Sequence, residues 1–287
     1  MKKLKYLLLV VIAASFITGC SFFKDSLEDS VIYTSVYPIK YLVKYLYGDY
    51  ATIESIYPAG ADVTTYKLTD KQISSYADSD LFIYNGLSNE KTIAKNLINK
   101  NRNLLIIDVS YGLSIKYGMK ELWLSPNDYL MLAKNIKNSL IENIKSQIII
   151  DYINKKYDEL EINLSLKDAE LRSIANEAKN KKRSTIVVSD DDLKFLENYG
   201  FDVISLDPDT LTESAYNIIK NDFKNKTYKS VLVLDGNETD DIKRLKSSYY
   251  ANLVNVSSLT NDEELTNDDY LMNMEMFIEA IKNICLN

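Results

Sequence analysis

The tract at residues 127–199 contains neither proline nor glycine, and it constrains the fold more than any other part of the chain. Both residues commonly end helices, so their absence allows long uninterrupted ones. Over residues 147–180, apolar side chains recur at helical spacing along one stripe: Ile149, Ile153, Tyr157, Leu160, Leu164, Leu171 and Ile174. At 1.5 Å per residue, a helix over this range would be about 50 Å long.

A helix of this length has two ordinary uses. It can form a coiled coil between copies of the chain, or it can be a stiff spine that joins two lobes of one chain. A shorter helix precedes it, with Ser125, Pro126 and Asp128 at its start. Because compact lobes are predicted on both sides of the tract, we expect a spine within a monomer.

Strand-like and helix-like stretches alternate on both sides of this tract. Apolar or β-branched strands are predicted at 31–37, 51–57, 81–86 and 104–108, and again at 184–189, 201–206, 230–235 and 252–256. Helices are predicted from Pro38 to Gly48, after a capping box at Thr69 and Gln72, and at 89–98, 190–199, 211–225, 238–249 and 270–285. This alternation is typical of parallel βαβ units.

The predicted fold class is α/β, with two lobes of parallel sheets joined by a long rigid helix and a ligand cleft between the lobes. The N-terminal lobe covers 30–126, a helical segment that includes the spine covers 127–182, and the C-terminal lobe covers 183–287. Open α/β sheets bind ligands at the carboxyl ends of their strands. The loops that follow the predicted strands are therefore the candidate binding loops.

The N-terminus has the pattern of a bacterial lipoprotein signal. Three lysines precede an apolar run at 7–16 that is too short to span a bilayer, and small residues then lead to Cys20. The alternative is an ordinary signal peptide with an incidental cysteine. We expect a signal peptide at 1–19, lipid on Cys20, a tether at 20–29, and an extracytoplasmic protein anchored to the cell membrane.

Charge and cysteine content exclude some classes of partner. Removing the three lysines of the signal from the 34 basic residues leaves 31, against 41 acidic residues. This acidic balance argues against nucleic acid as a partner. Cys285 falls on the apolar stripe of the last predicted helix, so we expect a buried thiol without a disulfide partner.

Four stretches of the chain, in order, resemble one protein family: YPAGADVTTY at 57–66, DSDLFIYNGLSNE at 78–90, LWLSPNDYLMLAKNI at 122–136, and the NYGF that ends at residue 201. The family is the zinc- and manganese-type substrate-binding lipoproteins of bacterial ABC importers, described in part as adhesins. The resemblance implies a receptor that works with permease and ATPase subunits. It also implies one divalent metal ion, the transported ligand, held between the lobes by histidines and a carboxylate.

The same resemblance assigns one ligand position to each of four loops. Thr64 stands where the first histidine is expected, and Glu121 stands two residues before the Trp-Leu pair of the second loop. Ser189 takes the third position, and Ser257 replaces the aspartate of the fourth. The chain contains no histidine, so this is a divergent member that lacks the usual ligands.

The chemistry of these four residues predicts that binding of a transition metal is weakened or lost. Three neutral hydroxyls and one carboxylate are poor ligands for zinc, and Glu121 is the best single candidate. Asp62 and Asp190 are possible auxiliary ligands that would favour a harder ion such as Mn²⁺, Mg²⁺ or Ca²⁺. Equally, Asp62 is a turn residue and Asp190 a helix-start acid.

Other readings of the cleft stay open. Tyr66 and Trp123 can hydrogen-bond and stack on a small non-metal solute, or they can be packing residues of the framework. The same scaffold would also serve as a surface interaction or structural lipoprotein. We expect no enzymatic activity, because no paired acid–base groups and no glycine-rich phosphate loop stand out.

Overall fold

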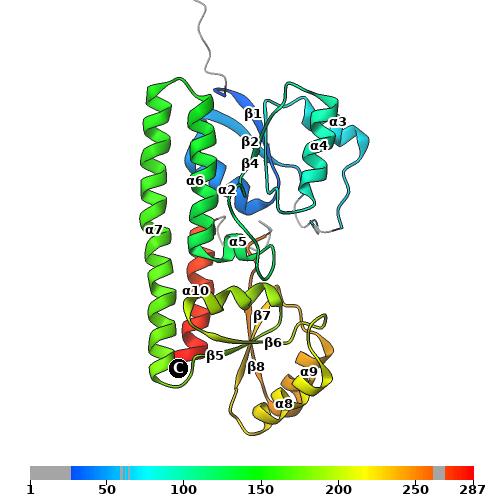
Figure 1. The fold of residues 1–287 in the computed structure, drawn as a ribbon, viewed down its shortest axis with the longest axis vertical. Coiled ribbons are helices and arrows are strands. Elements are labelled where there is room, and N and C mark those ends of the chain that lie inside the picture. Colours follow the sequence, from blue (N-terminus) through cyan, green and yellow to red (C-terminus); the bar gives the residue numbers. More distant parts are fainter. Residues whose placement is uncertain (1–26, 59–60, 62, 64, 261–268) are drawn as a thin grey trace, which may run out of the picture.

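The computed structural model describes residues 27–58, 61, 63, 65–260 and 269–287, and these form two α/β lobes beside one long helix. Figure 1 shows the lobes one above the other, with the long helix α7 (Gln147–Asn180) running past both of them. The predicted fold class, two lobes with parallel sheets and a long connecting helix, is confirmed. The domain boundaries themselves stay predictions.

The N-terminal lobe is built on four parallel strands. They are β1 (Ser30–Thr34), β2 (Ala51–Ser55), β3 (Leu81–Tyr84) and β4 (Leu105–Asp108), in the spatial order β2-β1-β3-β4. The connections between strands contain α2 (Tyr37–Tyr47), the short helix η1 (Gly48–Tyr50), α3 (Asp70–Ala77) and α4 (Glu90–Lys100). In Figure 1, α3 and α4 lie on the opposite side of the sheet from α7.

The C-terminal lobe repeats this strand order. Its strands are β5 (Thr185–Val188), β6 (Asp202–Ser205), β7 (Ser230–Leu234) and β8 (Asn252–Val256), arranged as β6-β5-β7-β8 and again all parallel. Its helices are η2 (Asp191–Tyr199), α8 (Glu213–Lys224), α9 (Asp240–Tyr249) and α10 (Tyr270–Leu286). Both lobes therefore present the carboxyl ends of their strands at one edge of a sheet, where the candidate loops begin.

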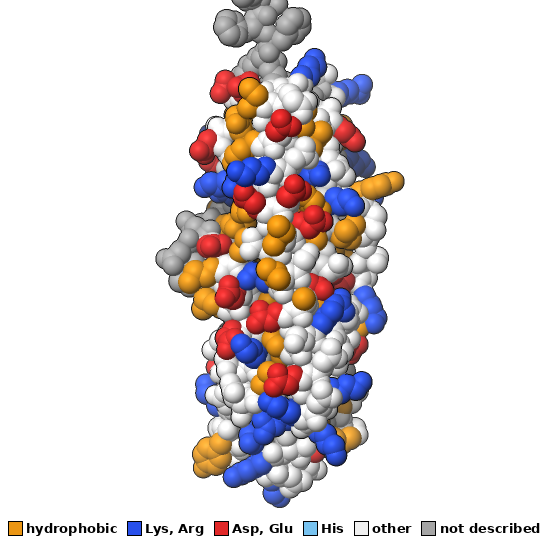
Figure 2. Space-filling model, turned by 90° about the vertical axis from the view of Figure 1, so that its left-hand side faces the viewer, with side chains coloured by type: hydrophobic (Ala, Val, Ile, Leu, Met, Phe, Trp, Pro, Cys, Tyr) orange, Lys and Arg blue, Asp and Glu red, His pale blue; other side chains and the backbone are white. Residues whose placement is uncertain are grey.

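The spine is formed as the apolar stripe predicts. Helix α6 (Pro126–Asn143) packs against α7, and every residue of the predicted stripe on α7 is buried. Figure 2 shows the outer face of this side of the molecule, where acidic and basic side chains are interspersed with small groups of apolar ones. The apolar stripe of α7 thus packs on α6, α10 (Tyr270–Leu286) and α2 of the same chain.

Local sequence signals set the ends of several helices. Thr69 and Gln72 form the expected capping box at the start of α3. Pro38 lies in the first turn of α2, and Gly48 ends that helix with a φ of 63°. Gly200 ends η2 with a φ of 103°, a conformation that other residues rarely adopt.

The helix predicted at 190–199 forms over residues 191–199, and it is a 3₁₀ helix in which Leu193, Leu196 and Tyr199 are buried at three-residue spacing. Two other local predictions are wrong in detail. The first strand ends at Thr34, and Tyr37 already begins α2. Glu121 lies in a short helix (Glu121–Leu124) and not in a loop. The sequence did not predict this helix, since an apolar run of three residues is too short to show helical periodicity.

The buried side chains form two clusters. The larger one lies between the spine side and both sheets, and it includes Cys285, which is free and buried as predicted. The smaller one lies between the C-terminal sheet and the pair α8 and α9. Among the described residues, none of the helices combines the length and the apolar character that crossing a bilayer requires.

Candidate functional site

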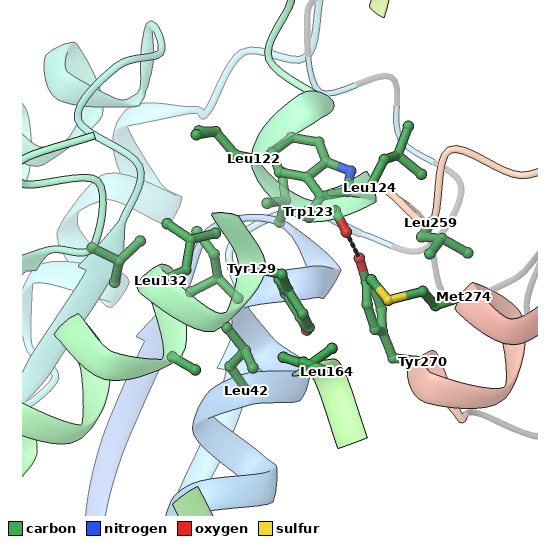
Figure 3. Close-up of a cluster of buried hydrophobic side chains, with 14 of the residues drawn as sticks. Leu42, Leu122, Trp123, Leu124, Tyr129, Leu132, Leu164, Leu259, Tyr270 and Met274 are labelled. Atoms are coloured by element: carbon green, nitrogen blue, oxygen red, sulfur yellow. Dashed lines mark hydrogen bonds between the residues drawn. The ribbon is translucent and has the colours of Figure 1, made fainter. Parts of the chain in front are cut away.

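The two lobes meet at the segment that follows β4. This segment ends in α5 (Glu121–Leu124), whose four residues are all buried. Trp123 is only 3% exposed, and its Nε1 donates a hydrogen bond of 2.9 Å to the carbonyl oxygen of Ser258, just after β8. The hydroxyl of Tyr270 donates to the carbonyl oxygen of Trp123 (Figure 3). Trp123 therefore connects the end of the N-terminal lobe to two segments of the C-terminal lobe.

Aromatic and aliphatic side chains fill the space behind this connection. Tyr129 of α6 stacks on Tyr270, with 4.4 Å between the ring centroids, and its hydroxyl donates to the carbonyl oxygen of Pro38 at 2.8 Å. Figure 3 shows the side chains that surround the two rings, among them Leu42, Leu124, Leu164, Leu259 and Met274. Because the packing is close and the hydroxyls are hydrogen-bonded, α5 is held in one position between the lobes.

Glu121 uses its carboxylate within its own loop. The residue is 4% exposed, and its Oε1 accepts the backbone N–H of Lys116 at 2.5 Å. Its Oε2 accepts the backbone N–H of Tyr117 at 3.2 Å. Burial raises the pKa of Glu121, and these two hydrogen bonds oppose the rise. Both oxygens therefore brace the turn that precedes α5.

The two serines at predicted ligand positions also bond to backbone. Ser189 follows β5 and is buried, and its Oγ accepts the N–H of Leu234 at 2.9 Å. The Oγ of Ser257 accepts the N–H of Leu259 at 3.0 Å. The Ser189 hydroxyl connects the end of β5 to the last residue of β7, and the Ser257 hydroxyl stabilises the turn after β8. A neutral hydroxyl is in any case a weak ligand for a transition metal.

Other predicted site residues lie elsewhere or outside the described residues. Tyr66 is half-buried, and its hydroxyl accepts a hydrogen bond of 2.8 Å from Nε2 of Gln72, the glutamine of the capping box. Thr64, Asp62 and Cys20 lie outside the described residues. The first ligand loop and the lipid attachment site therefore stay predictions.

Asp190 belongs to a cluster of charges between the lobes. Its Oδ2 lies 3.6 Å from Nζ of Lys120, the residue that precedes α5. The same ammonium lies 3.2 Å from Oδ2 of Asp192 and 3.9 Å from Oδ2 of Asp235, which follows β7. One cation from the connection after β4 thus meets three carboxylates from two strand ends of the C-terminal lobe.

The pKa shifts of this cluster reflect its excess of negative charge. Burial alone would lower the pKa of Lys120, but the carboxylates of Asp192, Asp190 and Asp235 outweigh it and raise that pKa. The pKa of Asp192 is also raised, because burial and the charge of Asp190 outweigh the attraction of Lys120. Three carboxylates share one ammonium, so the single positive charge of Lys120 does not neutralise all three negative charges.

Of these four residues only Asp190 was predicted as a site residue, and Lys120, Asp192 and Asp235 were not. Lys120 stands directly before Glu121, and Asp235 ends the apolar stretch SVLVLD. An acidic residue at the carboxyl end of a predicted strand was the available signal. Nothing in the sequence indicates that Asp190, Asp192 and Asp235 pair with a lysine 70 to 115 positions earlier in the chain.

A second buried carboxyl group lies in the N-terminal lobe, at the start of α4, with its hydrogen-bond partner just after β3. Glu90 is 4% exposed, and its Oε2 accepts the backbone N–H of Asn85 at 2.9 Å. Burial raises the pKa of Glu90 to about 7. Among the described ligand positions, Glu121, Ser189 and Ser257, Glu90 makes no hydrogen bond or ion pair with any.

The described side chains at the predicted ligand positions are one carboxylate and two hydroxyls. In the part of the chain that the structure describes, no group of three or more histidine, cysteine, aspartate or glutamate side chains is placed to hold a metal ion. The three aspartates near Lys120 converge on an ammonium, which already supplies a positive charge at that point.

Comparison with known proteins gives the family. The model of the family ZnuA, "Zinc-uptake complex component A periplasmic", matches residues 32–284. The metal ABC transporter substrate-binding lipoprotein SsaB of Streptococcus sanguinis is 30% identical over 162 residues, which are 50% of this chain and 52% of that protein. The iron-binding protein YfeA of Yersinia pestis is 24% identical over 194 residues, 64% of this chain and 61% of that protein. The chain thus spans about half to three fifths of these two curated relatives.

Solved structures share the fold. The metal-dependent lipoprotein YcdH of Bacillus subtilis superposes with a TM-score of 0.75 at 19% identity, covering 90% of this chain and 100% of that one. The Zn(II)-bound ZnuA-like domain of AdcA from Streptococcus pneumoniae gives a TM-score of 0.72 at 19% identity, with coverage of 90% and 100%.

The family model extends across both lobes and the spine, from β1 to the last turns of α10. The matched range includes the loops after β4, β5 and β8, where the described predicted ligand positions lie. The chain therefore belongs to the ZnuA family, zinc-uptake complex component A.

Proposed function

We propose that this protein is the solute-binding receptor of an ABC importer in which the transition-metal site of the interlobe face has been weakened. The receptor role comes from the family and from its relative SsaB, a metal ABC transporter substrate-binding lipoprotein. The weakened site is our own inference from the side chains of this chain.

One observation carries the proposal: the side chains at the described ligand positions are engaged with backbone. Glu121 accepts two backbone N–H groups, and Ser189 and Ser257 each accept one. A metal ion would compete with these N–H groups for the oxygen lone pairs, and it would gain only one carboxylate and neutral oxygens as ligands. Zinc and its neighbours prefer imidazole, thiolate and carboxylate ligands.

The remaining parts of the proposal follow from the N-terminal pattern and the family. Lipid on Cys20 would anchor the receptor to the outer side of the cytoplasmic membrane, and permease and ATPase subunits would be its partners. Binding and release of a solute need no chemical step, so we propose no enzymatic activity. A monomer suffices, because both lobes and the spine come from one chain.

Calorimetry on the chain without its predicted signal peptide and lipid (residues 21–287) tests the weakened site. After chelator treatment, we expect Zn²⁺ and Mn²⁺ to bind more weakly than about 1 µM, which corresponds to about 8 kcal/mol of binding free energy. Glu121→Gln should leave this weak binding unchanged, because the carboxylate already serves the backbone.

The opposite result is equally clear. A single site that binds Zn²⁺ or Mn²⁺ tighter than micromolar, and that is lost in Glu121→Gln while the variant remains folded, would show a functional metal receptor. Weak binding in both proteins would instead direct the search to organic solutes or protein partners of the same scaffold.

A further inference from the structure

The charge cluster between the lobes has an ordered geometry. Each of its three aspartates points one carboxylate oxygen at the same atom, Nζ of Lys120, at 3.2, 3.6 and 3.9 Å. We call Lys120, Asp190, Asp192 and Asp235 the ammonium cage. Among the described residues, Lys120 is the only cation within ion-pair distance of these three acids.

The other oxygen of each aspartate is held by a backbone N–H. Oδ1 of Asp190 accepts from Asp192 at 2.8 Å, and Oδ1 of Asp235 accepts from Ser258 at 2.5 Å. Oδ1 of Asp192 accepts from the backbone N–H of Lys120 at 3.4 Å. The backbone therefore sets the direction of all three carboxylates, so their free oxygens converge before any cation is considered.

A glycine allows the closest of these approaches. A Cβ added at Gly118 would lie 1.6 Å from Oδ1 of Asp192, which no pair of atoms tolerates. Asp192 can lie against the segment before α5 only because residue 118 has no side chain. The cage is thus supported by the backbone on both of its sides.

We propose that Lys120 is the specificity-determining residue of the interlobe face: its ammonium is the resident cation of the cage and takes the place that a cationic solute would otherwise occupy. This inference deepens the proposed function and rests on it, because it treats the interlobe face as the binding face. The Lys120 side chain is 27% exposed and the three aspartates 16–29%, so the cage is partly buried and still reaches solvent.

The charges explain why a second cation is excluded. A divalent ion that approached the three oxygens would meet the ammonium at close range, and displacing Lys120 would break three ion pairs at once. Removing the side chain should have the reverse effect. Three carboxylates would then face one another without a counter-ion, and the space would accept a free primary ammonium.

Chemical rescue tests this directly on residues 21–287. Lys120→Ala should lower the midpoint of thermal unfolding by on the order of 5 °C, because three acids lose their counter-ion. Propylammonium chloride has the length of the missing side chain, and it should restore most of this loss in Lys120→Ala. Tetramethylammonium chloride at equal ionic strength should not, since it cannot donate a hydrogen bond.

Lys116→Ala is the matched control. Lys116 lies in the same loop and carries the same charge, but its ammonium is exposed and contacts Tyr117 outside the cage. Neither this variant nor the wild type should respond to propylammonium beyond the effect of salt. If Lys120→Ala is as stable as Lys116→Ala, or if propylammonium and tetramethylammonium act alike on it, the assignment of Lys120 is wrong.

A double variant covers the case in which Lys120→Ala does not fold. Adding Asp192→Asn removes one uncompensated charge and keeps an oxygen for the backbone N–H of residue 120, so Lys120→Ala/Asp192→Asn should unfold at a higher temperature than Lys120→Ala. A double variant that also fails to fold, or that unfolds no higher than a folded Lys120→Ala, would overturn the cage. Since rescue is measured by unfolding, its result does not depend on whether the wild type binds Zn²⁺, and the two proposals fail separately.

Discussion

Replacing Glu90 by glutamine should make the protein more stable above neutral pH. Glu90 is 4% exposed at the start of α4, and burial raises the pKa of its carboxyl group from 4.5 to about 7. Burial outweighs the hydrogen bonds that the carboxylate accepts, among them that from the backbone of Asn85. The folded protein therefore favours the neutral acid, whereas the unfolded chain releases the proton near pH 4.5.

The magnitude follows from the difference between the two pKa values. The contribution of Glu90 to the free energy of unfolding is fully present below pH 4.5 and is lost as the pH rises through 7. Between these two pH values the carboxyl group ionises in the unfolded chain but stays protonated in the folded protein. A shift from 4.5 to about 7, at 1.36 kcal/mol per unit, gives a loss of about 3 kcal/mol. Most of it, about 2.5 kcal/mol, falls between pH 5 and pH 8.

Urea unfolding at pH 5 and pH 8 measures this loss. The fluorescence of Trp123, the only tryptophan, reports on the contact between the lobes. From pH 5 to pH 8, wild type should lose about 2.5 kcal/mol more than Glu90→Gln, and the variant should gain relative stability at pH 8. The exposed Glu142→Gln is the control and should follow the wild type.

A different outcome would refute the reasoning about burial. If wild type and Glu90→Gln change equally between the two pH values, to within about 0.5 kcal/mol, then Glu90 is ionised in the folded state at little cost. The carboxylate would in that case be solvated, and the end of β3 would be open to water.

Two further predictions concern the framework. Thr69→Ala should cost about 1 kcal/mol in urea unfolding, because it removes the side chain that accepts the N–H of Gln72 in the capping box of α3; no loss would mean that α3 does not depend on its cap. Leu164→Ala should cost about 2–5 kcal/mol, since this side chain is fully buried on the stripe of α7. Leu166→Ala, on the same helix but 64% exposed, should cost less than about 1 kcal/mol, and equal losses would contradict the assigned orientation of α7.

The sequence by itself determined the spine and the layout of both lobes. The stripe from Ile149 to Ile174 repeats at helical spacing, and the helix that results covers the predicted range 147–180. Thr69 with Gln72 and Gly48 placed helix ends because capping depends on residues three or four apart. These features are local, so periodicity and capping rules are enough to read them.

The resemblance also directed attention to the loops that follow β4, β5 and β8. The described part of those loops does lie where the lobes meet, through Trp123 and the turn after β8. What the sequence could not give is the partner of each side chain there. Glu121 carries the charge expected of a ligand, yet its oxygens bind the backbone of its own loop.

Only the tertiary structure decided which charges meet. Lys120 pairs with aspartates about 70 and 115 residues further along the chain, and no pattern within one loop encodes such a contact. The pairing exists because two parallel sheets direct their carboxyl ends at α5, and because backbone N–H groups turn the three carboxylates toward one point. Side-chain direction in such a cluster depends on packing between distant elements, and packing is the property that a linear pattern does not contain.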